Sequence, residues 1–373
     1  MERRRFIHKA SLGAAAGALV GCGAATDEGG APAVQTGKRV RWRMASSFPR
    51  AFDIIYRTSE HLAERVAALT GGRFEIIVYP AGEIVPGLQV LDAVQNRTVP
   101  IGHTSGFYYI GKNPAIAFET CVPFGFTARQ QEAWIRYGGG LEATRKILSD
   151  FSIYNLPGGN TGAQMGGWWR QPIESLADLR GLKMRIPGLG GRVMSELGVN
   201  ALTLAGGEIY QALERGTIDA MEWTGPYDDE KAGFYKVAPY YYYPGWWEPG
   251  AMVAFYVNQS EWDALPSQYQ DALTAASHEA HALMVAGYDA QNPPALDRLL
   301  ADGAQLRRFP DDVMQAAYEA SQDLLADTAR GDSGYREVYD SFRTFQRASN
   351  RWFEVAEQSY ASFAFSHTSQ QPG

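Results

Sequence analysis

Segments typical of strands and segments typical of helices alternate along the first part of this chain, and this alternation limits its fold more than any other feature. Residues 54–69 carry apolar side chains at helical spacing and end at a pair of glycines, a common way to end a helix. The pattern predicts strand 39–45, helix 54–69, strand 74–79, helix 86–96 and strand 99–104. Strands that are joined through helices run parallel, so an α/β fold with a parallel or mostly parallel sheet is expected.

A second series of strands and helices begins near Gly158. Before this point, a helix is predicted over residues 128–136 and continued to 150 after three glycines. The predicted strands of the second series cover residues 164–169, 182–186, 200–203, 217–221 and 240–243, and its helices cover 191–197 and 207–215. The strand predicted over residues 252–258 has no series of its own, and we expect it to return to the first sheet. From Pro266 on, the chain has a helical pattern apart from a strand at 305–309.

These segments predict two α/β lobes that are joined by more than one crossing, with a ligand cleft between them. A long helix connects the lobes, and a helical tail follows them. The expected boundaries are 38–158 with 252–295 for lobe I, 159–251 with 296–331 for lobe II, and 332–365 for the tail.

The N-terminal residues match an export signal. Three arginines precede Phe6 and Ile7, and residues 10–21 are small and uncharged, a pattern typical of twin-arginine signals. Residues 19–22 are similar to the lipobox of bacterial lipoproteins, which predicts that residues 1–21 are removed and that Cys22 is lipidated. The alternative is cleavage nearby without a lipid on Cys22. Residues 22–37 are small, polar and rich in glycine, alanine and proline, as in a flexible tether.

The overall charge excludes one class of partner. The chain has a net charge of −7, and residues 1–21 carry four basic residues and one acidic residue, so the remainder has a net charge of −10. An acidic surface argues against nucleic acid as a partner. It does not argue against a small anionic ligand, because one buried arginine can dominate locally. No stretch after the signal is apolar for long enough to cross a membrane.

The end of the strand predicted over 217–221 is a candidate ligand site. Glu222 and Trp223 follow the strand directly, and Gly225-Pro226 enforces a turn before any helix can start. Ligands of open α/β sheets bind outside the carboxyl ends of the strands. The alternative is an acid that faces water beside a core tryptophan.

Arg185 is a candidate anion-binding residue. It lies in an apolar strand just before Pro187-Gly188. A buried guanidinium keeps its charge and requires a carboxylate, from the protein or from a ligand, and its planar fork suits a bidentate carboxylate. A structural salt bridge is the alternative.

Several oxygen-bearing residues could hold a cation. The amides of Asn160 and Gln164 lie in a glycine-rich segment. Gln164, Glu222, Glu248 and the carbonyl oxygen of Trp223 would make a set of hard ligands suited to Na⁺, Ca²⁺ or Mg²⁺. The residues alone do not bring this set together.

Other patterns favour ordinary structural explanations. His278 and His281 lie three residues apart on a predicted helix and could share a metal, but we expect them to be exposed histidines on a helix face. The aromatic residues 240–243 and 246–247 are expected to pack in the core, with stacking against a ligand as the alternative. Because we find no nucleophile motif, we do not expect an enzyme.

Taken together, the chain resembles a solute-binding protein of the tripartite ATP-independent periplasmic (TRAP) transporters. The resemblance rests on the segments Pro123–Phe126, Gln164–Trp168, Asp178–Arg185, Gly207–Tyr210, Ile218–Trp223 and Tyr243–Glu248. It implies a periplasmic two-lobe receptor, lipid-anchored at Cys22, that passes its ligand to a membrane permease. The branch that binds 2-oxoacids such as pyruvate is the most similar one, and Trp223 stands where many members outside this branch have asparagine.

The resemblance also implies roles for residues. Arg185 would bind the ligand carboxylate, and Asn160, Tyr108 and Thr104 are weaker candidates for ligand contacts. The cation, Na⁺ in the first place and Ca²⁺ as the alternative, would be held by Gln164, Glu222, Trp223 and Glu248.

Three questions stay open at this point. The tail suggests a homodimer, as in the 2-oxoacid binder, or packing back onto the chain's own lobes. The ligand is expected to be a small monocarboxylate, a 2-oxoacid or a 2-hydroxy acid, and the alternative is a larger aromatic carboxylate or a polyol. An exported metal-dependent hydrolase or lyase is the alternative from another class.

Overall fold

The computed structural model describes residues 37–368, and every structural statement below refers to them. The predicted signal, Cys22 and nearly all of the tether lie outside this range. The strands are β1 (Val40–Ser46), β2 (Phe74–Tyr79), β3 (Ile101–Thr104), β4 (Ile153–Asn160), β5 (Trp168–Trp169), β6 (Lys183–Arg185), β7 (Asn200–Leu202), β8 (Ala220–Met221), β9 (Tyr240–Tyr243), β10 (Met252–Asn258) and β11 (Gln305–Arg308).

The helices lie largely where the sequence pattern predicts them. They are α1 (Asp53–Leu69), α2 (Val90–Gln95), α3 (Ala117–Thr120), α4 (Ala128–Tyr137), α5 (Gly140–Ser149), α6 (Gly188–Glu196), α7 (Ile209–Glu214), α8 (Pro226–Ala232), α9 (Gln259–Asp263), α10 (Ser267–Ala301), α11 (Asp311–Gly331), α12 (Ser333–Phe353) and α13 (Ser359–Thr368). A π-helical turn, Glu354–Gln358, links α12 to α13. The long helix and the helical tail are therefore confirmed.

The strands form two mixed sheets; in the first sheet half of the strand pairings are parallel, and in the second sheet three of the five are. The first has the order β2-β1-β3-β10-β4, and the second has the order β11-β9-β5-β8-β6-β7. In the first sheet β10 runs antiparallel to both of its neighbours, and in the second sheet β5 does so. The strand predicted over residues 252–258 is β10, and it does return to the first sheet. The exact boundaries of the two lobes stay a prediction.

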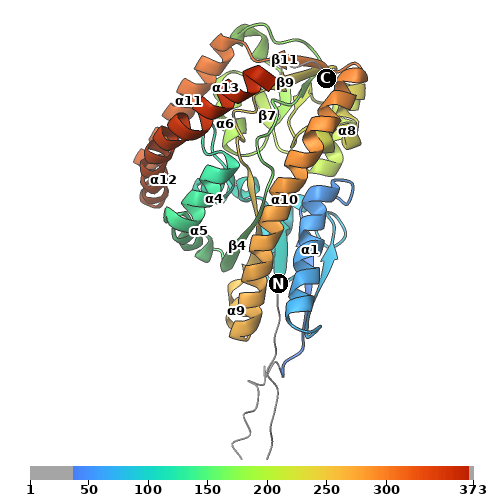
Figure 1. Ribbon diagram of the computed structural model, residues 1–373, viewed down its shortest axis with the longest axis vertical. Helices are drawn as coiled ribbons and strands as arrows, with labels where there is room; N and C mark the ends of the chain where they lie inside the picture. The colour runs from blue at the N-terminus through green and yellow to red at the C-terminus, as the bar shows by residue number, and fades with distance from the viewer. Residues whose placement is uncertain (1–36, 369–373) are drawn as a thin grey trace, which may run out of the picture. The chain divides into compact units, whose positions relative to one another are not determined.

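The chain passes between the sheets three times. The first crossing runs from β4 to β5, the second from β9 to β10, and the third is α10, which contacts α1 and β4 on one side and α8 on the other. Figure 1 shows α10 extending from α9, past α1, to the neighbourhood of α8.

The two crossing loops bind each other along their length. The backbone amide of Thr161 donates to the carbonyl of Ala251 (2.9 Å), and that of Gln164 donates to the carbonyl of Glu248 (3.2 Å). The amide of Gly166 continues this ladder by donating to the carbonyl of Tyr242 (2.7 Å). The two segments that join the sheets are thus held as one unit.

Two strands differ from the prediction, and the first difference has a local cause. The strand predicted over residues 164–169 is reduced to Trp168–Trp169, because residues 164–167 belong to the first crossing loop. Gly167 has a φ of +72°, and a Cβ at this position would lie 2.0 Å from the carbonyl oxygen of Met221. The backbone therefore turns here instead of continuing as a strand. Strand β4, which we did not predict, is buried along nearly its whole length.

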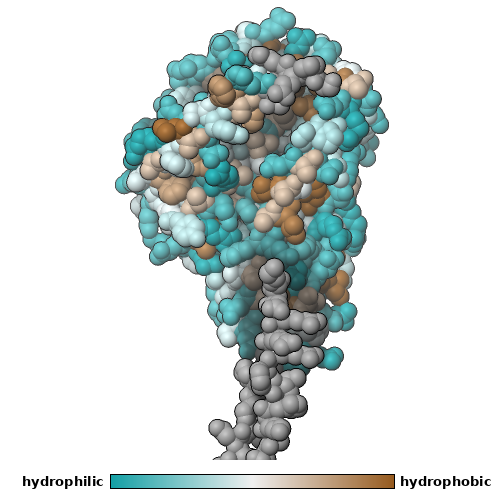
Figure 2. Space-filling model, in the orientation of Figure 1, coloured by the Kyte–Doolittle hydropathy of each residue, from teal (hydrophilic) through white to brown (hydrophobic). Residues whose placement is uncertain are grey.

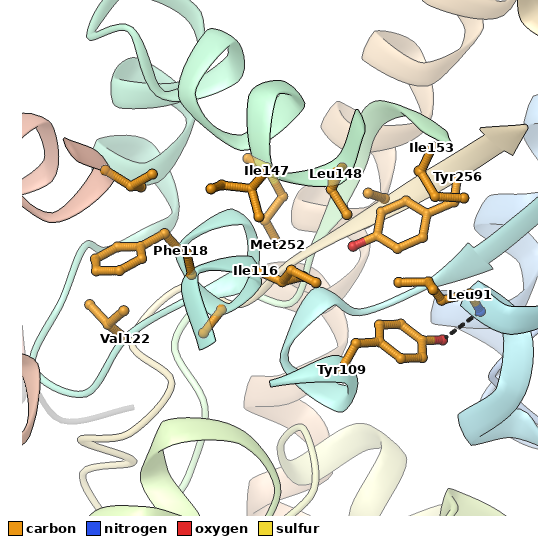
Figure 3. Packing of buried hydrophobic residues seen from close by; sticks show 14 of the residues in the cluster. Leu91, Tyr109, Ile116, Phe118, Val122, Ile147, Leu148, Ile153, Met252 and Tyr256 are labelled. Atoms are coloured by element: carbon orange, nitrogen blue, oxygen red, sulfur yellow. Dashed lines mark hydrogen bonds between the residues drawn. The ribbon is translucent and has the colours of Figure 1, made fainter. Parts of the chain in front are cut away.

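The tail packs against the first sheet's core and then leaves it. Figure 3 shows part of this core, with Phe118 and Val122 on one side and Tyr256 and Tyr109 on the other. The cluster also includes three side chains of α12, namely Tyr335, Val338 and Phe342. The first part of the tail therefore packs back onto its own lobe.

A buried histidine lies in the first sheet. His103 of β3 is fully buried between Phe255, whose ring stacks on it at 4.8 Å, and Phe48 at 5.1 Å. Neither ring nitrogen has a hydrogen-bond partner. Burial lowers the pKa of His103 to about 3, because the imidazolium would lose its hydration. His103 is therefore neutral in the folded protein at ordinary pH.

We predict that His103 makes the protein less stable in mild acid. An unfolded histidine has a pKa of about 6.5, so below that pH the unfolded chain takes up a proton that the folded chain excludes until pH falls to about 3. The free energy of unfolding should fall by roughly 1.5 kcal/mol between pH 6.5 and pH 5 from this residue. Urea unfolding of His103→Phe should lack this part of the pH dependence, whereas His367→Phe, at the exposed end of α13, should retain it. Equal pH dependence in wild type and His103→Phe would contradict the prediction.

Candidate functional site

The ends of two neighbouring strands bring the candidate residues together. Strands β6 and β8 are parallel, with Arg185 paired to Met221, so both carboxyl ends reach the same edge of the second sheet. The backbone amide of Glu222 donates to the carbonyl of Arg185 (3.2 Å), which extends the ladder by one step. Arg185 and Glu222 therefore leave the sheet side by side, at the position where ligands of α/β sheets bind.

The guanidinium of Arg185 is buried and only partly used by the protein. Its exposed fraction is 1%. Its Nη1 forms an ion pair with the carboxylate of Glu222 and donates to the carbonyl of the same residue (2.8 Å). Its Nε donates to the carbonyl of Leu204 (3.2 Å), while Nη2 is buried without a partner. The structural salt bridge is thus real, and one end of the guanidinium remains for a ligand.

Trp223 lies against this guanidinium. The Cζ of Arg185 is 5.1 Å from the centre of the indole, a distance at which a cation is attracted to the ring face. The ring of Phe52, from the start of α1, lies 4.6 Å from the indole. The indole Nε1 is buried without a partner. Glu222 is buried beside Trp223, so the alternative of an acid that faces water is wrong.

The two crossing loops supply the other polar residues. Gln164 lies on the first loop, and its Nε2 donates to the hydroxyl of Thr161 (3.0 Å). Its Oε1 is therefore directed away from that bond, and it is buried without a partner. Glu248 lies on the second loop and is also buried. The ladder between the loops keeps these two residues adjacent.

One cavity joins these residues. The cavity is small, with about 320 Å³ of empty space even when the open solvent at its mouth is included. Of the predicted site residues, six line it: Tyr108, Gln164, Arg185, Glu222, Trp223 and Glu248. They come from both sheets and from both crossing loops.

Asn160 and Thr104 lie close by but do not line the cavity. The side-chain amide of Asn160 donates to the carbonyl of Gly250 (3.1 Å) and accepts from the amide of Gly162 (2.9 Å). The hydroxyl of Thr104 bonds those of Ser47 (2.6 Å) and Tyr109 (2.7 Å). Both residues hold loops in place in this structure, and their predicted contact with a ligand stays a prediction.

Sequence reasoning missed the apolar wall of the cavity. It is formed by Phe48, Ile55, Phe107, Ala251 and Val253. Phe48 follows β1 and Phe107 follows β3, so both lie at carboxyl ends of strands in the first sheet. That position is the signal that could have identified them. By contrast, Trp246 and Trp247 are core residues and do not line the cavity, in agreement with the expected core packing.

Burial disfavours the charges that the site contains. It raises the pKa of Glu222 to about 7, although the nearby Arg185 lowers it. The pKa of Glu248 is raised well above its usual value, first by burial and then by the charge of Glu222. Two carboxyl groups thus face one guanidinium in a poorly hydrated space. When all three are ionised, one negative charge is left over.

The donor set suits a hard cation. Two carboxylates and the free amide oxygen of Gln164 are the kind of ligand that Na⁺ and Ca²⁺ take. Within residues 37–368, no group of three or more histidine, cysteine, aspartate or glutamate side chains is placed to hold a metal ion. A cation in this cavity therefore depends on amide or carbonyl oxygens as well as on the two carboxylates.

Of the two helix histidines, His278 is exposed, as we expected, whereas His281 is not. His278 contacts the guanidinium of Arg136, and Nε2 of His281 lies 3.5 Å from the carboxylate of Glu132. Both partners belong to α4, which packs near α10 at this point, and His281 is buried. Figure 2 shows hydrophobic residues gathered over the middle of α10 on the same face. The histidines connect two helices.

Residues 45–332 match the model of the DctP family, whose description is bacterial extracellular solute-binding protein, family 7. A monocarboxylate 2-oxoacid-binding periplasmic protein from Nostoc sp. is 51% identical over 98% of this chain and 100% of its own length.

Solved structures are similar over most of the chain. A TRAP transporter solute-binding protein from Bordetella bronchiseptica has a TM-score of 0.88 at 48% identity, and the alignment covers 89% of this chain and 99% of that one. It is described as a mixed-occupancy dimer with copurified calcium and picolinate. A TRAP periplasmic solute-binding protein from Pseudoalteromonas atlantica, with bound sodium and pyruvate, has a TM-score of 0.85 at 39% identity over 87% of this chain and 99% of its own.

Proposed function

Because the chain belongs to the DctP family of extracellular solute-binding proteins, and is a receptor of the TRAP type, we propose that it captures a small monocarboxylate together with a cation. The expected ligand is a 2-oxoacid such as pyruvate, or a 2-hydroxy acid. The receptor then delivers this ligand to the permease of its transporter.

One observation carries this proposal. Arg185 Nη2, a donor with a positive charge, and Gln164 Oε1, an acceptor, are both buried without partners, and both residues line the same small cavity. Buried polar groups in folded proteins are almost always paired. A carboxylate would satisfy the first atom, and a cation would satisfy the second.

The charges support a ligand pair over an anion alone. The raised pKa values of Glu222 and Glu248 favour their protonated forms in the empty site, whereas a cation requires both to be ionised. With these two and Arg185 ionised, a monocarboxylate bound alone would raise the excess from one negative charge to two. Such a charge would be costly in a buried site. A monovalent cation bound with the acid leaves the excess unchanged, and a divalent cation removes it. Na⁺ and Ca²⁺ are therefore both compatible with the cavity.

We assign the roles accordingly. Arg185 binds the carboxylate of the ligand through its free Nη2. Gln164 Oε1, the carboxylates of Glu222 and Glu248, and the carbonyl oxygen of Trp223 hold the cation, which supplies a positive charge for the carboxylate and the neighbouring oxygen of the ligand. Tyr108 lines the cavity and is a further candidate for a ligand contact.

The relatives' ligands share one chemical feature. Pyruvate has a keto oxygen, and picolinate a ring nitrogen, on the carbon next to the carboxylate. Both can therefore present two adjacent donors to one cation. Because the picolinate relative is 48% identical to this chain, an aromatic carboxylate is the second candidate ligand.

A binding protein fits the cavity better than a hydrolase or lyase. Proton transfer in hydrolysis needs a positioned base, most often a histidine. Among the residues that line the cavity there is no histidine, and His103 is buried in the first sheet outside this lining. We therefore infer that the chain is not an enzyme.

We predict cation-dependent binding of pyruvate. Isothermal titration calorimetry of the wild type should show binding of pyruvate in Na⁺ or Ca²⁺ and a loss of at least about 10-fold in affinity after cation removal. Arg185→Met should lower the affinity for pyruvate by about 100-fold, since a charge-assisted hydrogen bond is lost. Gln164→Met should weaken binding of the cation, and with it the cation-dependent part of pyruvate binding, whereas Gln315→Met on the surface of α11 should change neither. Failure of pyruvate, 2-oxobutyrate, lactate and picolinate to bind under any condition would refute the proposed ligand class.

We further propose that the receptor is a homodimer that forms through the end of its tail. Beyond the part of α12 that packs on the core, Trp352, Phe363 and Phe365 are 62%, 68% and 70% exposed. Val355 and Tyr360 between them are exposed as well. Large apolar side chains gathered on one segment commonly mark a protein interface. The first half of the tail would thus pack on its own lobe, and the second half would pack against a second copy of the chain.

Sedimentation velocity at micromolar concentration tests the dimer. The wild type should sediment as a dimer, and Phe363→Glu combined with Phe365→Glu should give a folded monomer, because two charges would be buried at the interface. Leu69→Glu, at the half-exposed end of α1, is the control and should remain dimeric. A monomeric wild type would eliminate this proposal.

We also propose that the mature protein lies in the periplasm and is anchored by a lipid on Cys22. Within residues 37–368, no helix is long and apolar enough to span a membrane. Expression in a Gram-negative host with an alkyne-labelled fatty acid should label the wild type and leave Cys22→Ala unlabelled. Equal labelling of both proteins would argue against an anchor at this position.

A further inference from the structure

The side chain of Trp223 has no part in the roles assigned above, which use only its carbonyl oxygen. Yet the residue is buried and lines the cavity, and its ring lies against the guanidinium that would bind the ligand. The space that the indole fills is therefore next to the position of the anion.

Gly206 allows the indole to lie where it does. A Cβ added at this glycine would lie 2.5 Å from Cη2 of Trp223 and 3.1 Å from Cζ2 and from Cζ3. A separation of 2.5 Å between carbon atoms is far inside van der Waals contact. The far edge of the indole thus rests directly on the backbone of Gly206.

The next glycine differs in this respect. A Cβ on Gly207 would have only Cγ of Pro49 nearby, at 3.8 Å, which is ordinary contact. Two adjacent glycines therefore have opposite tolerance for a methyl group, and only the first depends on Trp223.

Two further side chains pack against the ring. Phe52 lies 4.6 Å from the indole and Arg185 lies 5.1 Å from it, measured to ring centres. Phe52 is buried in the same core cluster as Trp223. With Gly206 at its edge, the ring cannot withdraw from the cavity without displacing one of these neighbours.

We propose that the indole of Trp223, seated on Gly206, is the wall that limits the size of the ligand. This inference rests on the proposed function, because it assumes that an acid binds to Arg185. A ligand that grows beyond the donor next to its carboxylate meets a ring that is fixed on three sides. The receptor thereby favours the shortest acids.

Replacing Trp223 by a smaller side chain should change the selectivity among acids of different length rather than abolish binding. The series pyruvate, 2-oxobutyrate, 2-oxopentanoate and 2-oxohexanoate is titrated by calorimetry at a fixed Ca²⁺ concentration. In Trp223→Phe and Trp223→Leu, the affinity ratio of pyruvate to 2-oxohexanoate should fall by at least about 10-fold relative to wild type, the scale of discrimination for one methylene in an apolar pocket.

Gly206→Ala tests the seat of the ring. The added methyl group should force the indole against Arg185 and weaken every acid in the series by at least about 10-fold. Trp223→Phe in the same chain should restore binding, because a phenyl ring is too short to reach Gly206. Gly207→Ala is the matched control and should bind as the wild type does. Circular dichroism and thermal unfolding establish that each variant is folded.

The outcomes separate the two proposals. If the wild type binds no acid of the series, and neither lactate nor picolinate, the proposed function fails, and this inference fails with it. If the wild type binds pyruvate but Trp223→Phe keeps the wild-type affinity ratio, only the present inference is overturned. If Gly206→Ala binds the acids as the wild type does, the claim that the indole depends on Gly206 is wrong. The test with Trp223→Phe does not depend on whether Gly206→Ala folds.

Discussion

The burial of one guanidinium beside two carboxyl groups is the constraint on which the rest of this site depends. Removing such charges from water is expensive, and mutual attraction offsets the loss only when hydrogen bonds satisfy the remaining polar atoms. Arg185 meets most of this requirement inside the protein, through Glu222 and the carbonyl of Leu204. What is left unsatisfied on Arg185 and Gln164 defines what the cavity can accept. The same atoms that make the empty site unfavourable thus make the filled site selective.

The order of strands in the second sheet explains why these groups meet. Strand β8 comes late in this series but lies between β5 and β6, so Glu222 emerges next to Arg185 although 37 positions separate them in the sequence. Both strands are short, and they end at the same edge. A sheet with β8 at its margin would place the acid away from the guanidinium and leave each buried charge alone.

Much of this arrangement could be predicted from the sequence, because strand–helix alternation and breaks at proline and glycine are local signals. Arg185 and Glu222 were identifiable in this way, since each marks the end of an apolar strand. The long-range partners were not. Nothing next to Asn160 in the sequence shows that its amide is used by the backbone of Gly250, and nothing near His281 shows that it contacts Glu132. The tail was ambiguous for the same reason, because its first part packs on the core through Tyr335, Val338 and Phe342 whereas the large apolar side chains near its end are exposed.

The crossing loops have a mechanical consequence. Gln164 and Glu248 lie on the two crossing loops that join the halves of the molecule, whereas Arg185 and Glu222 lie at the end of one sheet. A rotation of one half relative to the other would twist the crossing loops. It would therefore change the distances between the oxygen atoms of Gln164 and Glu248 on the loops and those of Glu222 on the sheet. A bound ion that draws the two sets of oxygen atoms together would therefore fix the conformation of the crossing loops. The angle between the two halves would then differ between the ion-bound and the ion-free protein.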